Sequence, residues 1–458
     1  MKQYDIAVIG GGPAGYVAAI KGAQLGADVV IFEKDTVGGT CLNRGCIPTK
    51  AYLKTADYIH NIRRAGERGI QLASPQLTVD MAKVLANKND VVKNLTSGVA
   101  GLLKANAVEV VNGRASLAPD GKVTCGGALY AAKNIILCGG SKAGKIPIPG
   151  VDGNPCVVTS DEILEINAVP KKLTIVGGGV IGCEMATAFA AFGSQVCILE
   201  LADRLVPTMD EDISAELKKS LEHQGVRVML SVKVAAIDGG AVFVEGQDKP
   251  LESDKILLSI GRSADLACLG GMKNSIRTEN GKVCVDMHMR TSVPNIYAAG
   301  DINGLCMLAH AASKMGETAA LNAMGHIETC NLTQVPGCLY TVPEAASVGL
   351  TEIEARKKYD AVVGRFQFGA NGRALASGEP GGFVKVVADE KYGEILGVHI
   401  FGGIATEMVC EAAALMAMEI TVHEVADTIH AHPTFSEAFM EACADALNRC
   451  VHLPPKKQ

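Results

Sequence analysis

A strand–helix–strand unit occurs twice in this chain, and this repeat constrains the fold more than any other feature. The first copy reads DIAVIGGGPAGYVAAIKGAQLGADVVIFE from residue 5, and the second reads KLTIVGGGVIGCEMATAFAAFGSQVCILE from residue 172. Each copy places G-x-G-x-x-G between a short apolar strand and an Ala-rich helix, and its second strand ends in Glu33 or Glu200. The glutamate lies 23 residues after the first glycine in both copies. The repeat predicts two similar α/β units in one chain.

The spacing of the glycines indicates what these units bind. The first glycine permits a tight turn, the second lets the backbone approach a pyrophosphate, and the third lets helix pack on strand. The helix N-terminus offers free N–H groups to the phosphates, and the glutamate accepts hydrogen bonds from ribose hydroxyls. One such motif also occurs for packing alone, but two complete copies predict two dinucleotide sites. The glycines are Gly10, Gly12 and Gly15 in the first copy and Gly177, Gly179 and Gly182 in the second.

The second glutamate bears on the choice of nicotinamide cofactor. A carboxylate at Glu200 suits a free ribose hydroxyl and repels a 2′-phosphate, which favours NAD over NADP. Arg204 lies four residues further on and is the one nearby cation that we weigh against this preference.

Length and composition set outer limits. With 458 residues a single core is not expected, and two to four domains are. A net charge of −6 gives no reason to expect nucleic acid or a membrane surface as a partner. Met1 to Tyr4 run straight into an apolar strand, so we expect no signal peptide. Fifteen cysteines without a regular framework fit a reducing, cytoplasmic location.

The stretch GGTCLNRGCIPTK, residues 38–50, carries two cysteines five positions apart, Cys41 and Cys46. They are half of a metal site, two ordinary thiols, or a redox pair. No second cysteine or histidine pair suits zinc, so we predict no metal site. In a regular helix their Cα atoms would lie about 9 Å apart, and a disulfide needs about 7 Å or less. If the two cysteines pair, the helix must be irregular there, as Gly45 and Pro48 favour.

The motif G-G-T-C-L-N-x-G-C-I-P-[ST]-K, after an N-terminal nucleotide-binding unit, resembles the flavin-dependent pyridine-nucleotide–disulfide oxidoreductases. The resemblance implies that Cys41 and Cys46 form a redox-active disulfide. It also implies that the first unit binds FAD and the second binds NAD.

The C-terminal part resembles the members of this family that oxidise dihydrolipoamide. The segments that carry it are HAHPTFSE at 430–437, ANGRALA at 370–376 and ILGVHIFG at 395–402, with IYAAGD at 296–301, MLAH at 307–310 and SIGR at 259–262. The implied activity is oxidation of protein-bound dihydrolipoamide to lipoamide with reduction of NAD⁺. The implied partners are a second copy, giving a homodimer, and a lipoyl-bearing protein of a 2-oxo-acid dehydrogenase, acetoin or glycine-cleavage complex.

The resemblance assigns roles to single residues. His432 becomes the acid/base that acts on the disulfide of the other subunit, and Glu437 orients its ring. From the residues alone, Thr434 to Glu437 is equally a capping-box pattern at a helix start. Lys50 is expected beside the flavin, paired with Glu184, although each fits a surface charge as well. Further FAD contacts are expected at Glu33, Gly113, Asp301, Met307, Leu308, Ala309 and His310, and NAD contacts at Glu200, Val234 and Gly261.

The sequence departs from the family pattern in a few places. Arg44 stands where an apolar residue is typical, which adds a charge next to the cysteines and bears on specificity. Thr49 replaces a commoner Ser and Phe435 a commoner Leu, while Cys138-Gly139-Gly140 replaces an Ala-Thr-Gly pattern.

The expected fold class is α/β, with two Rossmann-like dinucleotide-binding domains and a C-terminal α+β dimerisation domain. The predicted boundaries are 1–145 for the FAD domain, 146–264 for the NAD domain, 265–333 for a central segment completing the FAD site, and 334–458 for the interface domain. KIPIPGVDGNP, residues 145–155, is the predicted crossing. Two other functions stay open: another flavin-dependent disulfide or mercuric reductase, and a non-catalytic flavoprotein that binds a partner.

Overall fold

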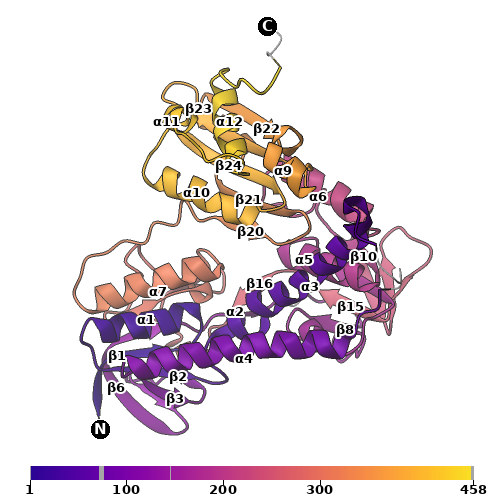
Figure 1. Cartoon of the computed structure of the whole chain (residues 1–458). Helices are drawn as coiled ribbons and strands as arrows, with labels where there is room; N and C mark the ends of the chain where they lie inside the picture. Colours follow the sequence, from indigo (N-terminus) through magenta and orange to yellow (C-terminus); the bar gives the residue numbers. More distant parts are fainter. Residues whose placement is uncertain (1, 72–76, 145, 455–458) are drawn as a thin grey trace.

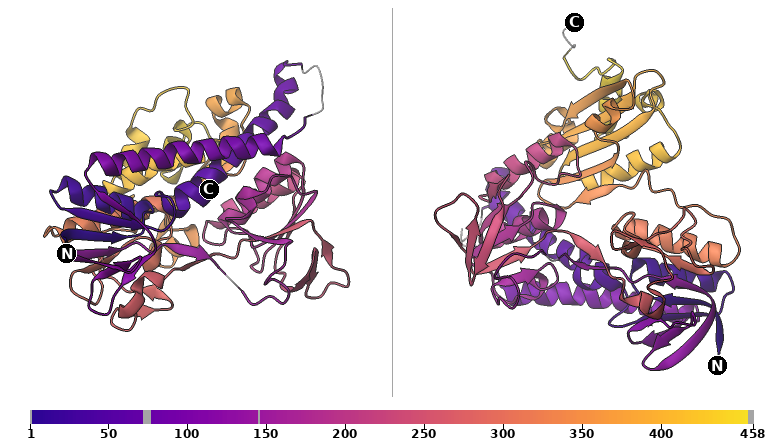
Figure 2. Two further views of the ribbon diagram at one scale, coloured as in Figure 1. Left: turned by 90° about the horizontal axis from the view of Figure 1, so that it is seen from below. Right: turned by 180° about the vertical axis from the view of Figure 1, so that it is seen from behind.

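The computed structural model describes residues 2–71, 77–144 and 146–454, arranged as three α/β units (Figure 1). Lys145, the first residue of the predicted crossing, and the last four residues of the tail lie outside the described residues. In Figure 1 the C-terminal unit stands above the other two, and the view from behind in Figure 2 shows the same arrangement. The mixed α/β class expected from the sequence is confirmed.

The first unit contains a mixed sheet in the order β3-β2-β1-β6-β5-β4, and β19 pairs with β6. The pairs among β1, β2, β3, β6 and β19 are parallel, whereas β4, β5 and β6 form an antiparallel meander. The strands are β1 (Gln3–Ile9), β2 (Val29–Glu33), β3 (Glu109–Asn112), β4 (Ala115–Leu117), β5 (Val123–Cys125), β6 (Ala128–Leu137) and β19 (Ile296–Ala298). Since β19 comes from the predicted central segment, that segment returns to the first sheet.

The helices of the first unit lie beside this sheet. Helix α1 packs against α7, and Gly316 permits the close approach, because a Cβ there would lie 2.1 Å from the carbonyl oxygen of Ala14. The segment that begins at Met81 forms the 25-residue helix α4. The helices are α1 (Pro13–Gln24), α2 (Gly39–Arg44), α3 (Cys46–Arg64), α4 (Met81–Ala105) and α7 (Ala309–Ala323), with 3₁₀ turns η1 (Ala65–Arg68), η3 (Ala267–Met272) and η4 (Asp301–Asn303).

The second unit has a fully parallel sheet in the order β11-β10-β9-β15-β8, next to a small antiparallel sheet β12-β13-β14. Helix α5 is buried on nearly every side, as its apolar sequence requires. The elements are β8 (Val157–Thr159), β9 (Lys172–Val176), α5 (Val180–Phe192), β10 (Gln195–Leu199), α6 (Glu211–His223), β11 (Arg227–Met229), β12 (Val234–Asp238), β13 (Ala241–Val244), β14 (Leu251–Glu252), β15 (Lys255–Leu258) and the 3₁₀ turn η2 (Ile163–Glu165).

Two short antiparallel strand pairs complete this part of the chain. Strand β7 (Ser141–Ala143) pairs with β16 (Arg262–Ala264), and β17 (Thr278–Glu279) pairs with β18 (Lys282–Val283). The β7–β16 pair connects the first unit with the second, because β7 follows β6 of the first sheet and β16 follows β15 of the parallel sheet.

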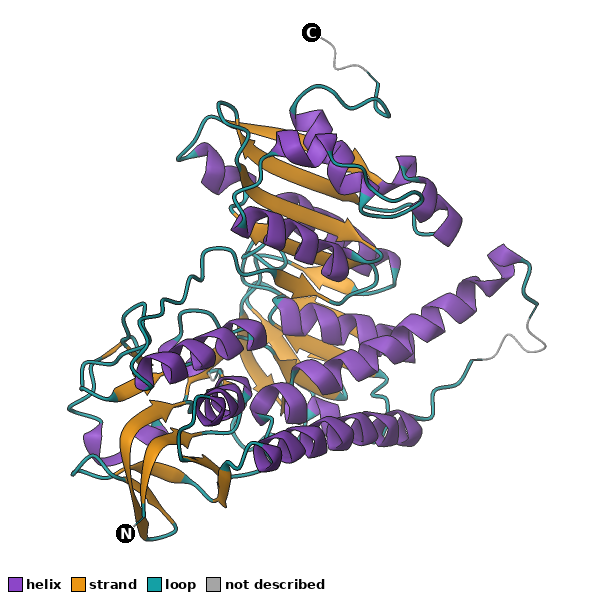
Figure 3. Cartoon of the chain, turned by 60° about the vertical axis from the view of Figure 1, so that its left-hand side comes forward, coloured by secondary structure: helices purple, strands orange, loops and turns teal. Residues whose placement is uncertain are grey.

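The third unit is an antiparallel sheet in the order β20-β21-β24-β23-β22, with helices against its strands (Figure 3). The segments FVKVVAD, ILGVHIF and TEMVCEAAALMAM correspond to β23, β24 and α10. The elements are β20 (Gly337–Leu339), β21 (Glu344–Gly349), α8 (Glu352–Arg356), β22 (Ala361–Gln367), η5 (Phe368–Ala370), α9 (Gly372–Ser377), β23 (Phe383–Asp389), β24 (Ile395–Gly402), α10 (Ala405–Ala417), α11 (Val422–Asp427) and α12 (Glu437–Ala446).

Helix α3 belongs to the first unit by sequence, but its buried face packs into the core of the second. The Tyr52 ring meets Phe189 and Phe192 edge-to-face, with ring centroids 6.4 and 5.9 Å apart. The Tyr52 hydroxyl donates to the carbonyl of Leu164 at 2.9 Å. Helix α3 is therefore held by two units at once, and its first turn lies at their junction.

A buried lysine joins the second and third units. The Lys385 ammonium, on β23, contacts Asp210 at 2.9 Å, Asp212 at 2.7 Å and Glu352 at 2.7 Å. Its side chain is only 3% exposed. A buried charge is tolerated because three carboxylates surround it. None of the helices in the described part of the chain has the length and apolar character to cross a membrane.

The Lys385 contacts predict a stability effect. Lys385→Met would remove the cation that contacts all three carboxylates. Asp212 and Glu352 keep their ion pairs with Arg365 and Arg356, but the buried Asp210 loses its lysine partner, and we expect the free energy of unfolding to fall by about 3 kcal/mol. Urea unfolding measures this. Lys391→Met, on the exposed turn after β23, is the matched control and should change stability by less than about 0.5 kcal/mol. Equal effects of the two substitutions would contradict the structural importance of the cluster.

Candidate active site

The two glycine-rich turns have the same geometry. Gly10 has φ +107° and Gly177 has φ +109°, a region that favours glycine. A Cβ on Gly10 would lie 2.1 Å from the carbonyl oxygen of Cys138, and one on Gly177 would lie 2.5 Å from that of Ser259. Each first glycine is therefore needed both for the turn and for the close approach of a neighbouring strand end.

The third glycine of each motif is crowded by neighbouring atoms, whereas the second glycine has open space around it. A Cβ on Gly15 or Gly182 would lie 1.8 or 2.0 Å from the carbonyl oxygen of the first glycine. By contrast, a Cβ on Gly179 would have no atom within 4 Å, and one on Gly12 would meet only the Cα of Gly39 at 3.7 Å. Gly12 and Gly179 are also the N-cap residues of α1 and α5. As glycines they have no side chain that could accept a hydrogen bond from the first N–H groups of the helix. Both helix starts therefore present open backbone N–H groups, which fits a dinucleotide pyrophosphate.

The glutamates that end the second strands are held in matching ways. Glu33 accepts hydrogen bonds from the backbone N–H groups of Gly11 at 2.7 Å and Asp35 at 2.9 Å. Glu200 accepts from the corresponding N–H groups of Gly178 and of Ala202, the latter at 2.7 Å. A carboxylate has about four acceptor positions, so these bonds fix each side chain and leave capacity for ribose hydroxyls.

Arg204 does not face the second glutamate. Its guanidinium pairs with Glu211 at 2.5 Å and donates to the carbonyl of Pro207 at 3.1 Å. These contacts engage two of the five N–H donors of Arg204 and hold its guanidinium against Glu211 and Pro207. Val234 begins β12, and the carbonyl of Gly261 accepts from Gly144 N–H at 2.8 Å.

The cysteine segment is broken where the sequence predicts an irregular turn. Helix α2 ends at Arg44, Gly45 adopts φ −141° and ψ −109°, and α3 begins at Cys46. The break turns two cysteines that are five residues apart toward each other, and the thiols of Cys41 and Cys46 are hydrogen-bonded. Both cysteines are free thiols in this structure, and the contact places them next to each other.

The two thiols differ in ionisation. The hydrogen bond from Cys41 and the Lys50 ammonium together lower the pKa of Cys46 to about 7, against the effects of burial and of the Glu184 carboxylate. The same hydrogen bond and burial raise the pKa of Cys41 above its ordinary range. Cys46 also stands at the first position of a 19-residue helix, where the dipole favours a thiolate. The negative charge of the reduced pair therefore resides on Cys46.

Lys50 and Glu184 form the expected ion pair between the first and second units. The Lys50 ammonium contacts both carboxylate oxygens of Glu184, at 2.9 and 3.0 Å. Glu184 is 3% exposed and Lys50 is 29% exposed at the side chain. The third unit joins them, because the backbone N–H of Tyr340 donates to Glu184 at 3.0 Å. Sequence reasoning missed Tyr340, which no motif marks.

The expected flavin contacts come from several segments of the chain, and of these Asp301 acts on Cys41. Gly113 follows β3, and its N–H donates to the carbonyl of Glu33 at 2.8 Å. Asp301 accepts from the Ser141 hydroxyl at 2.5 Å, and Ser141 in turn accepts from Arg262 at 2.7 Å. Met307, Leu308, Ala309 and His310 form the start of α7, whose N-cap residue Leu308 provides no side-chain cap.

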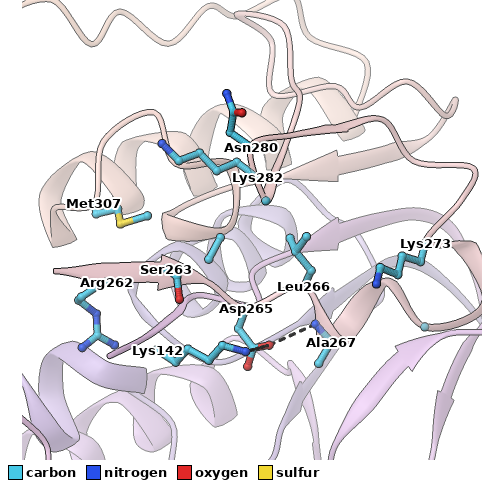
Figure 4. Close-up of a pocket in the computed structure, with 13 residues that line it drawn as sticks. Lys142, Arg262, Ser263, Asp265, Leu266, Ala267, Lys273, Asn280, Lys282 and Met307 are labelled. Atoms are coloured by element: carbon cyan, nitrogen blue, oxygen red, sulfur yellow. Dashed lines mark hydrogen bonds and ion pairs between the residues drawn. The ribbon is translucent and has the colours of Figure 1, made fainter. Parts of the chain in front are cut away.

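A groove and a cavity lie near these residues. A groove of about 290 Å³ lies between α3 and α4 and is lined by Lys50, Lys54, Tyr58 and Leu95 among others. A larger cavity of about 640 Å³ is lined by Lys142, Arg262, Lys273 and Lys282 and by Met307. Figure 4 shows Lys142 lying beside Asp265 in that cavity, with Lys282 and Met307 on its other side. The larger cavity therefore adjoins the expected contacts of both cofactors.

The departures from the family pattern are explained by their contacts. Arg44 pairs with Asp35 at 2.9 Å, so its charge is offset at the surface. Phe435 is buried and packs edge-to-face on Phe368, with ring centroids 5.6 Å apart. Cys138 lies under the first glycine turn, and Thr49 is buried. These residues serve packing and charge balance.

The His432 loop holds a second pair of functional groups. His432 Nδ1 lies 2.8 Å from a Glu437 oxygen, and the other oxygen accepts from the Thr434 N–H at 2.8 Å. Glu437 thus contacts the histidine and the helix-start backbone together. The reciprocal half of a capping box is absent, because the Thr434 hydroxyl donates to the carbonyl of Ala431 instead.

Asn371, inside the ANGRALA segment, supports this loop. Its side chain caps α9 by accepting from Ala374 N–H at 2.9 Å, and it donates to the carbonyl of Thr434 at 3.0 Å. An Asn before a helix predicts the cap, but the sequence gives no sign of the contact with the loop. In the same loop, His430 Nε2 lies 3.0 Å from a carboxylate oxygen of Glu411.

The structure of one chain does not bring all the predicted groups together. The His432 side chain is 76% exposed, and within the described residues its bonded partner is Glu437. The surroundings of Cys41 and Cys46 include Lys50, Glu184 and Asp301 but not His432. Across residues 2–71, 77–144 and 146–454, no group of three or more metal-ligating side chains is suited to a metal ion.

Comparison with known proteins gives consistent matches along the chain. Residues 4–316 match the family described as pyridine nucleotide-disulphide oxidoreductase, and residues 335–443 match its dimerisation domain. The chain is 40% identical over 456 residues to a dihydrolipoyl dehydrogenase of Bacillus subtilis, covering 98% of this chain and 99% of the relative. A dihydrolipoyl dehydrogenase of Thermus scotoductus is 40% identical over 464 residues, covering 99% of each.

A solved structure extends the comparison. The HOCl-induced flavoprotein disulfide reductase RclA from Escherichia coli, in its Cu(II) complex, superposes with a TM-score of 0.87 at 28% identity. The match covers 97% of this chain and 99% of that chain.

The glycine geometry predicts that two substitutions in one motif act differently. Gly179→Ala places a methyl in open space, so the protein should fold normally and lose at least tenfold in NAD affinity. Gly182→Ala forces a methyl against the Gly177 carbonyl and should destabilise the fold. Thermal unfolding and NADH binding by fluorescence separate the two effects. Normal NADH binding by a folded Gly179→Ala protein would contradict the assignment of this turn.

Proposed function

The chain belongs to the pyridine nucleotide-disulphide oxidoreductase family, and we propose that it oxidises protein-bound dihydrolipoamide to lipoamide with reduction of NAD⁺. The observation that carries the proposal is the Cys41–Cys46 pair, placed beside the Lys50–Glu184 ion pair. Identity of 40% over nearly the full length to dihydrolipoyl dehydrogenases supports the substrate.

The residues present fit the two cofactors. Gly10, Gly12, Gly15 and Glu33 would hold the FAD dinucleotide, and Gly177, Gly179, Gly182 and Glu200 would hold NAD. FAD, when bound, supplies the two-electron transfer that takes electrons from the dithiol and delivers them to NAD⁺. Lys50, Gly113, Asp301 and the start of α7 are the proposed further contacts with FAD, and Val234 and Gly261 those with NAD.

Thiol chemistry on the cysteine pair follows from the asymmetry of its ionisation. In the oxidised pair, a substrate thiolate attacks Cys41, the Cys41–Cys46 bond breaks, and Cys46 leaves as a thiolate. Cys46 suits this part because its pKa is about 7. The second substrate sulfur then attacks the first, which closes the lipoyl disulfide and releases Cys41. Cys41 takes up a proton because its pKa is raised.

His432 is the proposed base that removes the substrate proton, with Glu437 fixing its ring at 2.8 Å. Its 76% exposure on a single chain fits a group that acts across a dimer interface, and residues 335–443 match the family's dimerisation domain. We therefore propose a homodimer in which His432 of one chain serves the cysteine pair of the other.

The proposed partner is a lipoyl-bearing protein of a 2-oxo-acid dehydrogenase, acetoin or glycine-cleavage complex. The groove between α3 and α4, next to Lys50, supports access of a long thiol-bearing arm. The proposed location is the cytoplasm, which the set of free cysteines supports.

An anaerobic titration of the holoenzyme with dihydrolipoamide tests this function. We expect a long-wavelength absorbance band from the Cys46 thiolate beside the flavin, which disappears as NADH forms after NAD⁺ is added. If dihydrolipoamide leaves the spectrum unchanged while NADH still bleaches it, the proposed substrate is wrong. The function would then be that of another disulfide reductase, of which the likeness to RclA is an example.

A hybrid dimer tests the sharing of the site. Cys46→Ser and His432→Gln homodimers should each lose at least about 100-fold in turnover. A hybrid of the two chains, purified with two different tags, keeps one site with an intact cysteine pair and an intact partner histidine. We expect about half of the wild-type activity from it. An inactive hybrid, with both homodimers folded and containing FAD, would place the complete site within one chain.

A further inference from the structure

Tyr340 of the third unit meets the Lys50–Glu184 ion pair with both its backbone and its side chain. The residue directly follows β20, and its N–H donates to Glu184 at 3.0 Å. The Lys50 ammonium lies over the Tyr340 ring, 4.4 Å from the centroid. One residue of the third unit therefore contacts both partners of an ion pair that joins the other two.

The Tyr340 ring is itself held at its far end. Its side chain is hydrogen-bonded to the thiol of Cys338, two residues earlier. Burial raises the pKa of Tyr340 to about 12, so its hydroxyl stays protonated and can donate. Burial also raises the pKa of Cys338 to about 11. The Tyr340 hydroxyl and the Cys338 thiol are therefore both uncharged at neutral pH, and their contact restrains the ring.

Restraint of Lys50 matters because the position of its ammonium affects the pKa of Cys46. Lysine has a flexible four-carbon stem, and the Lys50 side chain is 29% exposed. The Lys50 ammonium lowers the pKa of Cys46, whereas the nearby Glu184 carboxylate raises it. The two effects oppose each other, so a small displacement of the ammonium changes their sum. A cation over an aromatic face is restrained by the attraction between them.

We infer that Tyr340 is a positioning residue that acts through Lys50 to keep Cys46 in its thiolate form. The inference rests on the proposed function, because it concerns the same cysteine pair. It adds a role for the third unit within the site of its own chain, separate from the contribution of His432 to the partner.

The charged and titratable groups around this contact come from several elements. Cys46 is faced by Cys41 of α2, by Lys50 one turn later on α3, and by Glu184 of α5. Tyr340 is faced by Cys338 and by the carboxylates of Glu344, Glu184 and Glu407. Lys50 is thus the cation that lowers the pKa of both Cys46 and Cys338. Tyr340 therefore affects Cys46 by restraining Lys50.

The test measures the ionisation of Cys46 directly. The reduced holoenzyme is alkylated with iodoacetamide across pH, and the Cys46 peptide is quantified by mass spectrometry. The wild-type midpoint is expected near 7. Tyr340→Leu keeps the backbone N–H but removes the ring, and we expect the midpoint to rise by about half a pH unit. The thiolate fraction well below the midpoint would then fall about threefold.

Two further variants keep the proposal falsifiable. Tyr340→Phe retains the ring but loses the hydroxyl that contacts Cys338, so its midpoint should lie closer to wild type than that of Tyr340→Leu. Tyr392→Leu removes another lysine–tyrosine contact, in which the Lys391 ammonium lies 4.6 Å from the ring centroid on an exposed turn, and should change nothing. An unchanged midpoint in a folded, FAD-containing Tyr340→Leu protein would overturn the inference. So would a midpoint shift of the same size in Tyr392→Leu.

The outcome is independent of the substrate. If the wild-type protein fails to react with dihydrolipoamide, the proposed function fails while the alkylation midpoints still report on Tyr340. If dihydrolipoamide is oxidised normally and the midpoints of wild type and Tyr340→Leu coincide, only the positioning role fails.

Discussion

The ion pair between Lys50 and Glu184 is the contact on which the rest of the site depends. It joins residues 134 positions apart, from α3 and α5, and Tyr340 of the third unit donates to the same carboxylate. The pair can form only because α3 leaves the first unit and packs its Tyr52 into the core of the second. Its cation stands one helical turn after Cys46, where it favours the thiolate over the thiol. The packing of α3 against the second unit therefore places a positive charge near the sulfur of Cys46.

The chain divides the groups of the proposed reaction between a buried junction and an exposed loop. The cysteine pair, both glycine turns and Asp301 come from the first two units and the segment that returns to the first sheet. His432 and Glu437 stand together on the third unit with the histidine exposed. A base needs a substrate between itself and the disulfide, and in the proposed homodimer a second chain would set the two halves opposite each other. The match of residues 335–443 to a dimerisation domain is consistent with that division.

Much of this site could be predicted from the sequence, and the parts that could not have physical reasons. The glycine turns and their glutamates follow from local backbone geometry, and their surroundings agree with the spacing argument. The break at Gly45 follows from residue type. Tyr340 could not be found because its contacts reach residues more than 150 positions away without a motif. Likewise, Lys385 within an apolar strand gave no sign of the three carboxylates around it, and the charge of Arg44 is offset by Asp35 only in the folded chain.

The measurement that tests the central claim most directly is the ionisation of Cys46 in a Lys50→Met protein. The variant keeps the cysteine pair and the helix start but removes the cation that the junction holds. The account predicts that the pH midpoint of Cys46 alkylation in the reduced holoenzyme rises from about 7 by at least about one unit, because Glu184 then acts on Cys46 unopposed. A midpoint that stays near 7 in a folded Lys50→Met protein would contradict it and would leave the helix start and Cys41 as the causes of the low pKa.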